Sequence, residues 1–513
     1  MNNMFCFQCQ ETCGNNGCTM TGVCGKTAST SDAMDRLIQR LKVIALNRKP
    51  THELAIFIAK SLFMTITNTN FSERSIVNQL RKSEKLTGIT SFDAPLGVHS
   101  NGNEDIVSLR EFATYALKGI AAYMVHADEL DFKDESLDDF IFSALRKIAE
   151  STSISELSEL ISEEGAAAVK AMALLDMANT ETFGTPEKTI VKTYPGTRSG
   201  ILVSGHDLKD LYELLLQTEG KNIDIYTHGE MLPAHSYLLF KKFPHLYGHY
   251  GTSWHHQNVE FATFNGPILL TSNCITPVQE SYSGRIFTTG CCRYPNVPYI
   301  ENRSDGNMKD FSSVIELAAT LPPPMIIDNN DLLIGFGHAQ LTEYLNDIIE
   351  NIRNGSIKRL IVMAGCDGRQ KKRSYYTDLA NLLPLDTIIL TAGCAKYRFN
   401  RLSLGEINGI PRIIDAGQCN DSYSLAVFAL KLKEALGEED INKLPISFDI
   451  AWYEQKAVAV LLALLSLGFK NIRLGPTFPA FMSEHVSEII RKKYKLKQIT
   501  SPHEDIISML KGK

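Results

Sequence analysis

The sequence predicts a multidomain α + α/β protein in which an N-terminal helical domain is followed by two α/β domains. Residues 31 to about 180 carry apolar side chains at helical spacing, and beyond them short apolar runs alternate with longer amphipathic stretches. The chain has 513 residues, which is too many for one ordinary core. Turn-forming and proline-rich segments then suggest domains at 1–187, 188–325 and 326–513.

The helical part begins with a segment in which Ser31 and Asp32 are the expected N-cap residues. Apolar side chains follow them at a period near 3.6, which is typical of an amphipathic helix. Comparable patterns predict further helices at 52–66, 73–86, 106–127, 137–149 and 165–177. Several such helices with one apolar face each would bury those faces together as a bundle. Gly184 and Pro186 then supply turn residues near the end of this part.

The remainder of the chain shows the pattern of α/β domains. Short apolar runs of strand length occur at 200–204, 223–226, 268–271, 359–363, 387–391 and 412–415. The longer amphipathic stretches between them suit helices that cover a largely parallel sheet. Three consecutive prolines at 322–324 exclude a regular helix interior, so we expect the second domain boundary there.

Composition narrows the class of protein. Hydrophobic residues make up 44% and charged residues 21%, as in soluble globular proteins, and the net charge of −6 argues against a nucleic-acid partner. The N-terminus shows no signal-peptide pattern, and the apolar stretch at 457–469 is too short to span a membrane, so we expect a cytoplasmic protein without a membrane partner. In that reducing compartment the eleven cysteines indicate metal binding or catalysis rather than disulfides.

The first cysteines form a compact group. Cys6, Cys9, Cys18 and Cys24 have the spacing C-x2-C-x8-C-x5-C, and nearby glycines allow the backbone to bend around one centre. Four thiolates suit either tetrahedral zinc or an iron–sulfur cluster. A structural zinc knuckle and a set of free thiols are the alternatives, although a zinc ribbon would need a second C-x2-C pair. Cys13 is a fifth candidate ligand within the same segment.

A second set of potential ligands follows the predicted strands. One after another, strand-like runs lead to His206, Glu230, Cys274, Cys366, Cys394, Cys419 and Glu454. The carboxyl ends of parallel strands line one edge of a sheet, so these side chains could converge on one site between two domains. A lone cysteine after a strand is usually a small buried hydrophobe, and a lone glutamate is usually solvated. Their repeated placement is what favours a metal site.

The mixture of ligand types has a chemical meaning. Thiolates bind soft iron–sulfur units, whereas imidazole and carboxylate suit harder iron that is bound to oxygen. A site built from all three could be sulfide-bridged on one side and open to an oxygen or nitrogen substrate on the other. An open coordination position distinguishes a catalytic metal from a structural one.

At these positions the sequence closely resembles the hybrid-cluster proteins, also called prismane proteins or hydroxylamine reductases. The resemblance covers essentially the whole chain. Its motifs are FCFQCQET at 5–12, GCTMTGVCGK at 17–26, SGHDL at 204–208, YTHGEMLPA at 226–234, NGPILLTSNC at 265–274, AGCDGR at 364–369, TAGCAKYRFN at 391–400, DAGQCNDSYS at 415–424 and WYEQKAV at 452–458.

The resemblance implies two cofactors and a fold. A cubane [4Fe-4S] cluster is expected on the N-terminal cysteines Cys6, Cys9, Cys18 and Cys24. A hybrid [4Fe-2O-2S] cluster is expected on His206, Glu230, Cys274, Cys366, Cys394, Cys419 and Glu454. In the family the cysteine that matches Cys366 carries a persulfide sulfur, and Lys456 matches a lysine close to the cluster. The two α/β domains are expected to be Rossmann-like, with the hybrid cluster where the domains meet.

The resemblance also implies an activity: reduction of hydroxylamine to ammonia and water, of nitric oxide to nitrous oxide, or of both. An electron-donor reductase is the expected protein partner. Glu454, Lys456 and Cys366 are the expected catalytic residues, with Glu454, Lys456 or His228 as proton relays. For His228 and His235 we favour a simpler interpretation, as exposed or hydrogen-bonded loop residues.

Three alternatives remain at this stage. A relative of carbon-monoxide dehydrogenase would share the α/β architecture, but His206, Glu230 and Glu454 predict an oxygen-rich site rather than a nickel–sulfur one. A nitric-oxide-responsive protein could instead transfer nitrosyl groups to partner thiols. A purely structural zinc protein is the third alternative. The sequence assigns no role to the adjacent pair Cys291 and Cys292.

Overall fold

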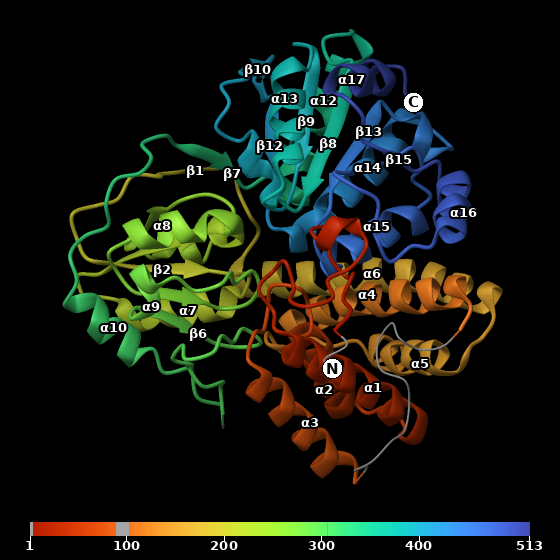
Figure 1. Ribbon diagram of the computed structural model, residues 1–513. Coiled ribbons are helices and arrows are strands. Elements are labelled where there is room, and N and C mark those ends of the chain that lie inside the picture. The colour runs from red at the N-terminus through yellow and green to blue at the C-terminus, as the bar shows by residue number, and fades with distance from the viewer. Residues whose placement is uncertain (1–3, 89–101, 305, 513) are drawn as a thin grey trace.

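The computed structural model describes residues 4–88, 102–304 and 306–512 and combines a helical part with two parallel sheets (Figure 1). This confirms the predicted mixture of helical and parallel-sheet segments. The helical part comes first in the chain. Its helices are α1 (Ala28–Asn47), α2 (His52–Met64), α3 (Glu73–Thr87), α4 (Glu104–Asp128), α5 (Glu135–Glu150) and α6 (Ile154–Phe183).

The expected cap of the first helix is wrong by one turn. Thr27 is the N-cap of α1, because its backbone is extended and its side chain accepts a hydrogen bond from the backbone N–H of Thr30. Ser31 and Asp32 therefore lie inside the helix. The last helix is also longer than its apolar pattern suggested, since Ser153 caps it and it runs without a break to Phe183.

The first sheet has five parallel strands in the order β4-β3-β2-β5-β6. The strands are β2 (Gly200–Ser204), β3 (Asp224–His228), β4 (Leu246–His249), β5 (Ile268–Leu270) and β6 (Ile286–Thr288). Every residue of β2 and β3 is buried, as expected for a parallel sheet covered on both faces. The α-helices of this segment are α7 (Leu208–Thr218), α8 (Gln257–Thr263), α9 (Glu280–Ser283) and α10 (Ser312–Ala319).

The second sheet has six parallel strands in the order β12-β9-β8-β13-β14-β15. They are β8 (Arg359–Gly365), β9 (Thr387–Thr391), β12 (Ile413–Asp415), β13 (Ile446–Ala451), β14 (Arg473–Gly475) and β15 (Lys497–Gln498). The α-helices of this segment are α11 (His338–Glu343), α12 (Leu345–Arg353), α13 (Ser374–Leu382), α14 (Ser422–Leu436), α15 (Gln455–Ser466), α16 (Glu484–Tyr494) and α17 (Pro502–Leu510). A short hairpin of β10 (Glu406–Ile407) and β11 (Ile410–Pro411) lies outside the sheet.

A small antiparallel pair connects the two sheet-containing segments. It consists of β1 (Thr189–Val191) and β7 (Leu332–Ile334). Residues 322–324 lie in a stretch without helix or strand, as their prolines require. The division at 1–187, 188–325 and 326–513 stays a prediction.

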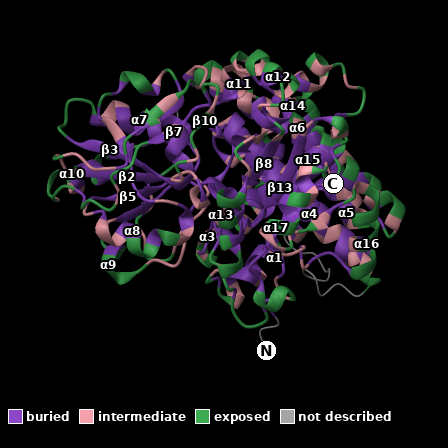
Figure 2. Cartoon of the chain, turned by 90° about the horizontal axis from the view of Figure 1, so that it is seen from above, coloured by how far each residue is buried: buried purple, intermediate pink, exposed green. Residues whose placement is uncertain are grey.

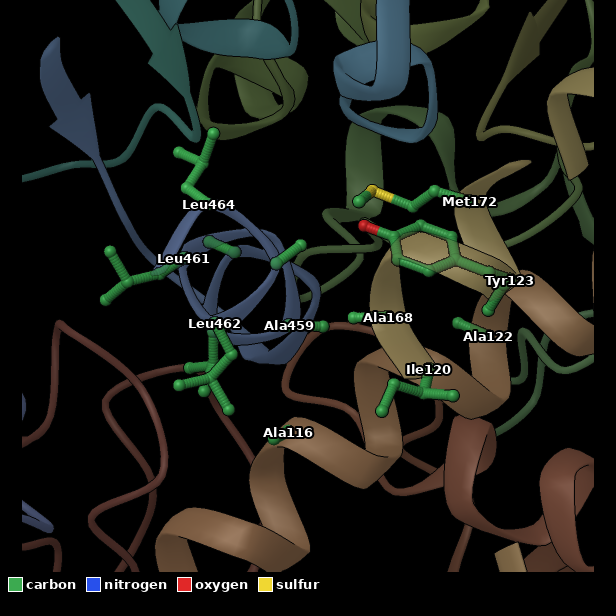
Figure 3. Packing of buried hydrophobic residues seen from close by; sticks show 14 of the residues in the cluster. Ala116, Ile120, Ala122, Tyr123, Ala168, Met172, Ala459, Leu461, Leu462 and Leu464 are labelled. Atoms are coloured by element: carbon green, nitrogen blue, oxygen red, sulfur yellow. The ribbon is translucent and has the colours of Figure 1, made fainter. Parts of the chain in front are cut away.

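Helix α15 packs into the helical part although it follows β13 in the chain. Figure 3 shows its side chains Ala459 and Leu462 facing residues of α4 and α6 such as Ala116 and Ala168. A Cβ atom on Gly119 of α4 would lie 2.6 Å from the carbonyl oxygen of Gln455. Close approach of these backbones therefore depends on the missing side chain.

Burial follows this architecture (Figure 2): the strands β8 and β13 and the neighbouring α15 are largely buried, and exposed residues gather on the outer helices. None of the helices in the described residues is long and apolar enough to cross a membrane.

Candidate metal centre

Each of the seven predicted ligands follows a strand, so the strand predictions on which they rested are confirmed. His206 and Glu230 come two residues after β2 and β3, and Cys274 comes four residues after β5. Cys366 directly follows β8, whereas Cys394, Cys419 and Glu454 follow β9, β12 and β13 after short loops. The carboxyl edges of both sheets thus supply these residues.

Three of the seven side chains come from different strands and meet closely. The Nε2 atom of His206 lies 3.3 Å from the Sγ atom of Cys419 and 3.8 Å from the Oε2 atom of Glu230. The ligand atoms of this group lie within 4.8 Å of one another, which is a spacing that a metal can bridge. The backbone N–H of Cys419 donates to Oε2 of Glu230 at 2.7 Å and holds the carboxylate toward the group.

The ring of His206 is oriented by the loop after β5. Its Nδ1 atom lies 2.9 Å from the carbonyl oxygen of Asn273, which can only accept, so Nδ1 carries the proton. The hydroxyl of Ser272 lies 3.1 Å from the same atom and accepts from the backbone N–H of His206. These contacts place the lone pair of Nε2 on the side of the ring where Glu230, Cys419 and Lys456 lie, as a metal-binding histidine requires.

Glu454 and Lys456 occupy the start of α15. The side chain of Glu454 caps this helix by accepting from the backbone N–H of Lys456 at 2.8 Å. The Nζ atom of Lys456 lies 3.0 Å from Nε2 of His206. Burial alone would lower the pKa of Lys456, but the negative charges of Cys419 and Glu454 outweigh burial and raise it. A buried positive charge therefore faces the candidate ligands.

The remaining thiols belong to the same electrostatic group. The pKa of Cys394 is raised well above its usual value by burial and then by Glu230, Cys366 and Cys274. Cys366 itself has its pKa raised to about 12 by burial and by the charge of Glu454. The backbone N–H of Asp367 donates to Sγ of Cys394 at 3.0 Å.

These residues fit an iron–sulfur–oxygen group. Burial raises the pKa of all four thiols, so thiolates are costly at this site unless a cation compensates their charge, as a bound metal does. The Oε1 atom of Glu230 is buried and has no hydrogen-bond partner in the described part of the chain. A buried carboxylate oxygen without a donor is costly unless a cation binds it. Soft sulfur and hard oxygen donors are both present, as a mixed cluster needs.

The N-terminal cysteines form a second, separate group. Cys6 and Cys18 pair through two backbone hydrogen bonds of 3.0 and 2.8 Å, which closes the loop that carries them. Cys6, Cys18, Cys9 and Cys24 line one cavity. Cys13 is exposed on the outer turn at Cys13–Asn15 and is not among the residues that line this cavity.

Two buried lysines face the N-terminal cavity. The ammonium group of Lys26 donates to the backbone carbonyls of Ile66 and Thr67, and that of Lys118 donates to Oε1 of Gln8 at 2.8 Å. Desolvation lowers the pKa of both lysines. Thiols of the cavity oppose this effect for Lys26, whereas for Lys118 the carboxylates of Asp35 and Glu111 oppose it more strongly than Cys6 does. Positive charge beside four thiolates suits an anionic cluster.

A short path of the chain connects the two groups. The backbone N–H of Gln10, next to Cys9, donates at 2.9 Å to the carbonyl oxygen of Tyr453, next to Glu454. The guanidinium of Arg373 donates to Gln10 and to the carbonyl oxygen of Cys366. The hydrogen bond between Gln10 and Tyr453 thus joins the immediate neighbours of one candidate ligand from each group.

His228 and His235, which were predicted as loop residues, are both buried. His228 contacts Ser204 through Nδ1 and Glu260 through Nε2, at 3.0 and 2.9 Å. His235 lies 3.0 Å from the hydroxyl of Thr227. These hydrogen bonds confirm the hydrogen-bonded alternative for both histidines rather than the exposed one. His228 is the last residue of β3, so its predicted loop position was wrong.

Sequence reasoning missed two residues at the site. Ser272 orients His206, and its only signal was a hydroxyl two residues before a candidate ligand. Lys396 follows Cys394 by two residues and is buried in an ion pair with Asp415. A lysine in a strand-end loop gives no sign in the sequence that it is buried.

The chain resembles known proteins over nearly its whole length. The model of the Prismane/CO dehydrogenase family matches residues 4–507. The hydroxylamine reductase of Nitratidesulfovibrio vulgaris is 49% identical over 99% of this chain and 100% of its own length. The hydroxylamine reductase of Chlorobaculum tepidum is 50% identical over the same shares.

A solved structure shows the shared architecture. Carbon monoxide dehydrogenase IV from Carboxydothermus hydrogenoformans matches with a TM-score of 0.61 at 15% sequence identity, over 99% of this chain and 92% of that chain. At this identity the likeness concerns the fold alone. The family model and the two sequence relatives cover nearly the whole chain, and the chain therefore belongs to the Prismane/CO dehydrogenase family.

Proposed function

We propose that this protein is an iron–sulfur oxidoreductase that reduces hydroxylamine to ammonia and water. The observation that carries this proposal is the convergence of His206, Glu230 and Cys419 from three strands, with a buried lysine beside them. The names of the two relatives point to the same substrate. The balanced reaction takes up two electrons and two protons and breaks one N–O bond.

In this proposal the N-terminal thiolates hold a [4Fe-4S] cluster and the seven strand-end residues hold a hybrid [4Fe-2O-2S] cluster. When bound, the hybrid cluster would supply an iron that polarises the N–O bond and would deliver the electrons. The chain itself contributes the surroundings: five of the seven proposed ligands are buried, and the buried Lys456 keeps its proton close to them. Lys456 is the proposed proton donor to the departing oxygen, and Glu454 holds the start of α15 in register.

Electrons are proposed to enter at the N-terminal cysteines and to pass along the Gln10–Tyr453 connection. This hydrogen bond joins the residue after Cys9 to the residue before Glu454. A rigid link favours a constant distance between the two groups. The electron donor is proposed to be a reductase or a small carrier protein.

The direct test is an anaerobic assay that uses hydroxylamine and reduced methyl viologen and measures ammonia. We expect multiple turnovers by the iron-loaded protein. Glu454→Gln should lower turnover by about 100-fold or more and leave the optical and EPR signals of the N-terminal cluster unchanged. Undiminished turnover would remove Glu454 from the reaction.

The same assay separates catalysis from nitrosyl transfer. A protein that only transfers nitrosyl groups to thiols would react stoichiometrically with nitric oxide and would not turn over hydroxylamine. Formation of nitrous oxide in a parallel assay with nitric oxide would show that nitric oxide is a second substrate. Iron and sulfide analysis of the anaerobically purified protein distinguishes an iron–sulfur enzyme or nitrosyl-transfer protein from a structural zinc protein.

A further inference from the structure

The surface above the N-terminal cysteines carries an exposed apolar centre. Met20 lies between Cys18 and Cys24 in the chain and is 84% exposed, the largest fraction among the large apolar side chains that the structure describes. Val23 in the same loop is 43% exposed. Cys6 and Cys24 are themselves partly exposed, so a redox centre bound there would lie close to solvent.

A basic rim borders this apolar centre. Arg369 donates to the carbonyl oxygen of Val23 at 3.0 Å, and the next residue, Gln370, accepts from the side chain of Gln10 at 3.0 Å. Residues 369–373 read Arg-Gln-Lys-Lys-Arg and lie against the N-terminal loop. The rim therefore lies against the loop that carries Val23 and Met20.

The two lysines of the rim are available to a partner. Lys371 and Lys372 are exposed at the turn Lys371–Arg373, and neither has an ion pair within the described residues. By contrast, the charge of Arg369 is balanced by Glu11 at 2.8 Å. The whole chain carries a net charge of −6, so this positive rim contrasts with the average surface. Such a contrast orients an acidic partner before contact.

We propose that Met20, Val23, Lys371 and Lys372 form the docking surface for a small acidic electron-carrier protein. The carrier would present a one-electron centre near its own surface, ringed by carboxylates that face Lys371 and Lys372. Met20 would supply the adaptable apolar contact at the middle of the interface. This inference rests on the proposed function, because it assumes that electrons enter at the N-terminal cysteines. One reduced carrier delivers one electron, so two encounters supply the two electrons for each hydroxylamine.

The test uses the anaerobic holoenzyme and a reduced, acidic plant-type [2Fe-2S] ferredoxin in a stopped-flow instrument. The double variant Lys371→Glu/Lys372→Glu should lower the second-order rate of cluster reduction by about 10-fold, and the remaining rate should no longer fall with added salt. Met20→Gln should lower the same rate by a smaller factor. The charge-matched control Lys221→Glu/Lys242→Glu changes two exposed lysines of the first-sheet segment and should stay within about twofold of wild type.

Two readouts keep this inference apart from the proposed function. Hydroxylamine turnover with reduced methyl viologen should be unchanged in Lys371→Glu/Lys372→Glu, and the EPR spectrum of the N-terminal cluster should match wild type. Failure of the wild type to turn over hydroxylamine would refute the proposed function, while cluster reduction by ferredoxin could still be measured. The proposed docking surface would be refuted if ferredoxin reduced Lys371→Glu/Lys372→Glu at the wild-type rate. It would also be refuted if ferredoxin did not reduce the wild-type protein.

Discussion

Individual residues at the candidate centre are held by a small number of directional contacts. His206 depends on the Asn273 carbonyl for its tautomer and on Ser272 for the position of its backbone. Lys456 depends on the negative charges around it for its proton. Such contacts act over a few ångströms, so a single substitution should remove one contact and leave the others in place.

Removing the hydroxyl of Ser272 should loosen His206. In Ser272→Ala the backbone N–H of His206 loses its acceptor, and we expect about a 10-fold loss of activity or of iron retained at the His206 site. Iron analysis after a chelator challenge measures the retention. Ser204→Ala is the matched control, because the hydroxyl of Ser204 contacts His228 instead. Equal iron retention in Ser272→Ala and Ser204→Ala would contradict the role of Ser272.

A buried carboxyl group in the helical part should make stability depend on pH. Glu164 is fully buried, neither of its carboxylate oxygens has a hydrogen-bond partner among the described residues, and burial raises its pKa well above the usual value. A raised folded-state pKa means that stability is retained at acidic pH and is lost as the pH rises from the carboxyl value of the unfolded chain.

Glu164→Gln removes that dependence, so its Tm should exceed the wild-type Tm by an amount that grows between pH 5 and pH 8. At the upper end we expect a gain of about 1–3 kcal/mol. Thermal unfolding at several pH values measures the difference. Glu159→Gln, at an exposed position of the same helix, is the control and should change Tm little. A Tm difference that stays constant with pH would argue against ionisation of Glu164.

At the scale of elements, α15 links the candidate centre to the helical part. It begins after its N-cap residue Glu454, runs beneath the second sheet and packs on α4 and α6 (Figures 1 and 3). The side chain of Gln455 donates to the carbonyl oxygen of Gln8 and accepts from the backbone N–H of Thr67, which ties the same helix to the N-terminal segment. Movement of α15 would therefore disturb both groups of ligands.

Gly119→Ala tests this connection. The new Cβ would lie 2.6 Å from the carbonyl oxygen of Gln455, so α15 must shift, and we expect a net loss of about 1–3 kcal/mol although alanine favours helices. The amount of iron bound at the His206 site should fall together with the stability. Gly284→Ala is the control, because no atom lies within 4 Å of the corresponding Cβ position. Normal stability and iron content in Gly119→Ala would show that the helices can separate without consequence.

At the scale of the whole molecule, the candidate ligands come from segments that are far apart in the chain. His206 and Cys419 are separated by 213 residues, and Gln10 reaches Tyr453 from the opposite end of the sequence. A metal that binds such residues favours the folded state over the unfolded chain, since the complete site does not exist in the unfolded chain.

Removal of iron should consequently destabilise the entire protein. We expect chelator-treated protein to unfold several degrees below the anaerobically purified holoprotein, because the folded state loses the free energy of metal binding. Differential scanning calorimetry under argon at one pH provides the comparison. Restoring iron and sulfide should recover the original Tm, and identical melting of both forms would show that the ligands do not bind metal in the folded state.

The sequence by itself determined the types of element and the order of the ligands. The apolar period of 3.6 predicted helices such as α2 and α3 within a few residues, and apolar runs predicted the strands before His206 and Cys366. These signals are local, because they depend on which face of one element is buried. The misplaced cap at Ser31 shows the limit: hydroxyl residues at 27, 30 and 31 compete, and packing selects among them.

Only the tertiary structure decided which of these residues meet and how they are oriented. Periodicity carries no information about the contact of Nε2 of His206 with Cys419, the burial of Lys396 or the tie between Gln10 and Tyr453. Nor could it show that Cys13 is exposed while four other cysteines line one cavity. The physical reason is that long-range contacts and desolvation depend on all the elements packed around a side chain, whereas a sequence pattern reports only on neighbours along the chain.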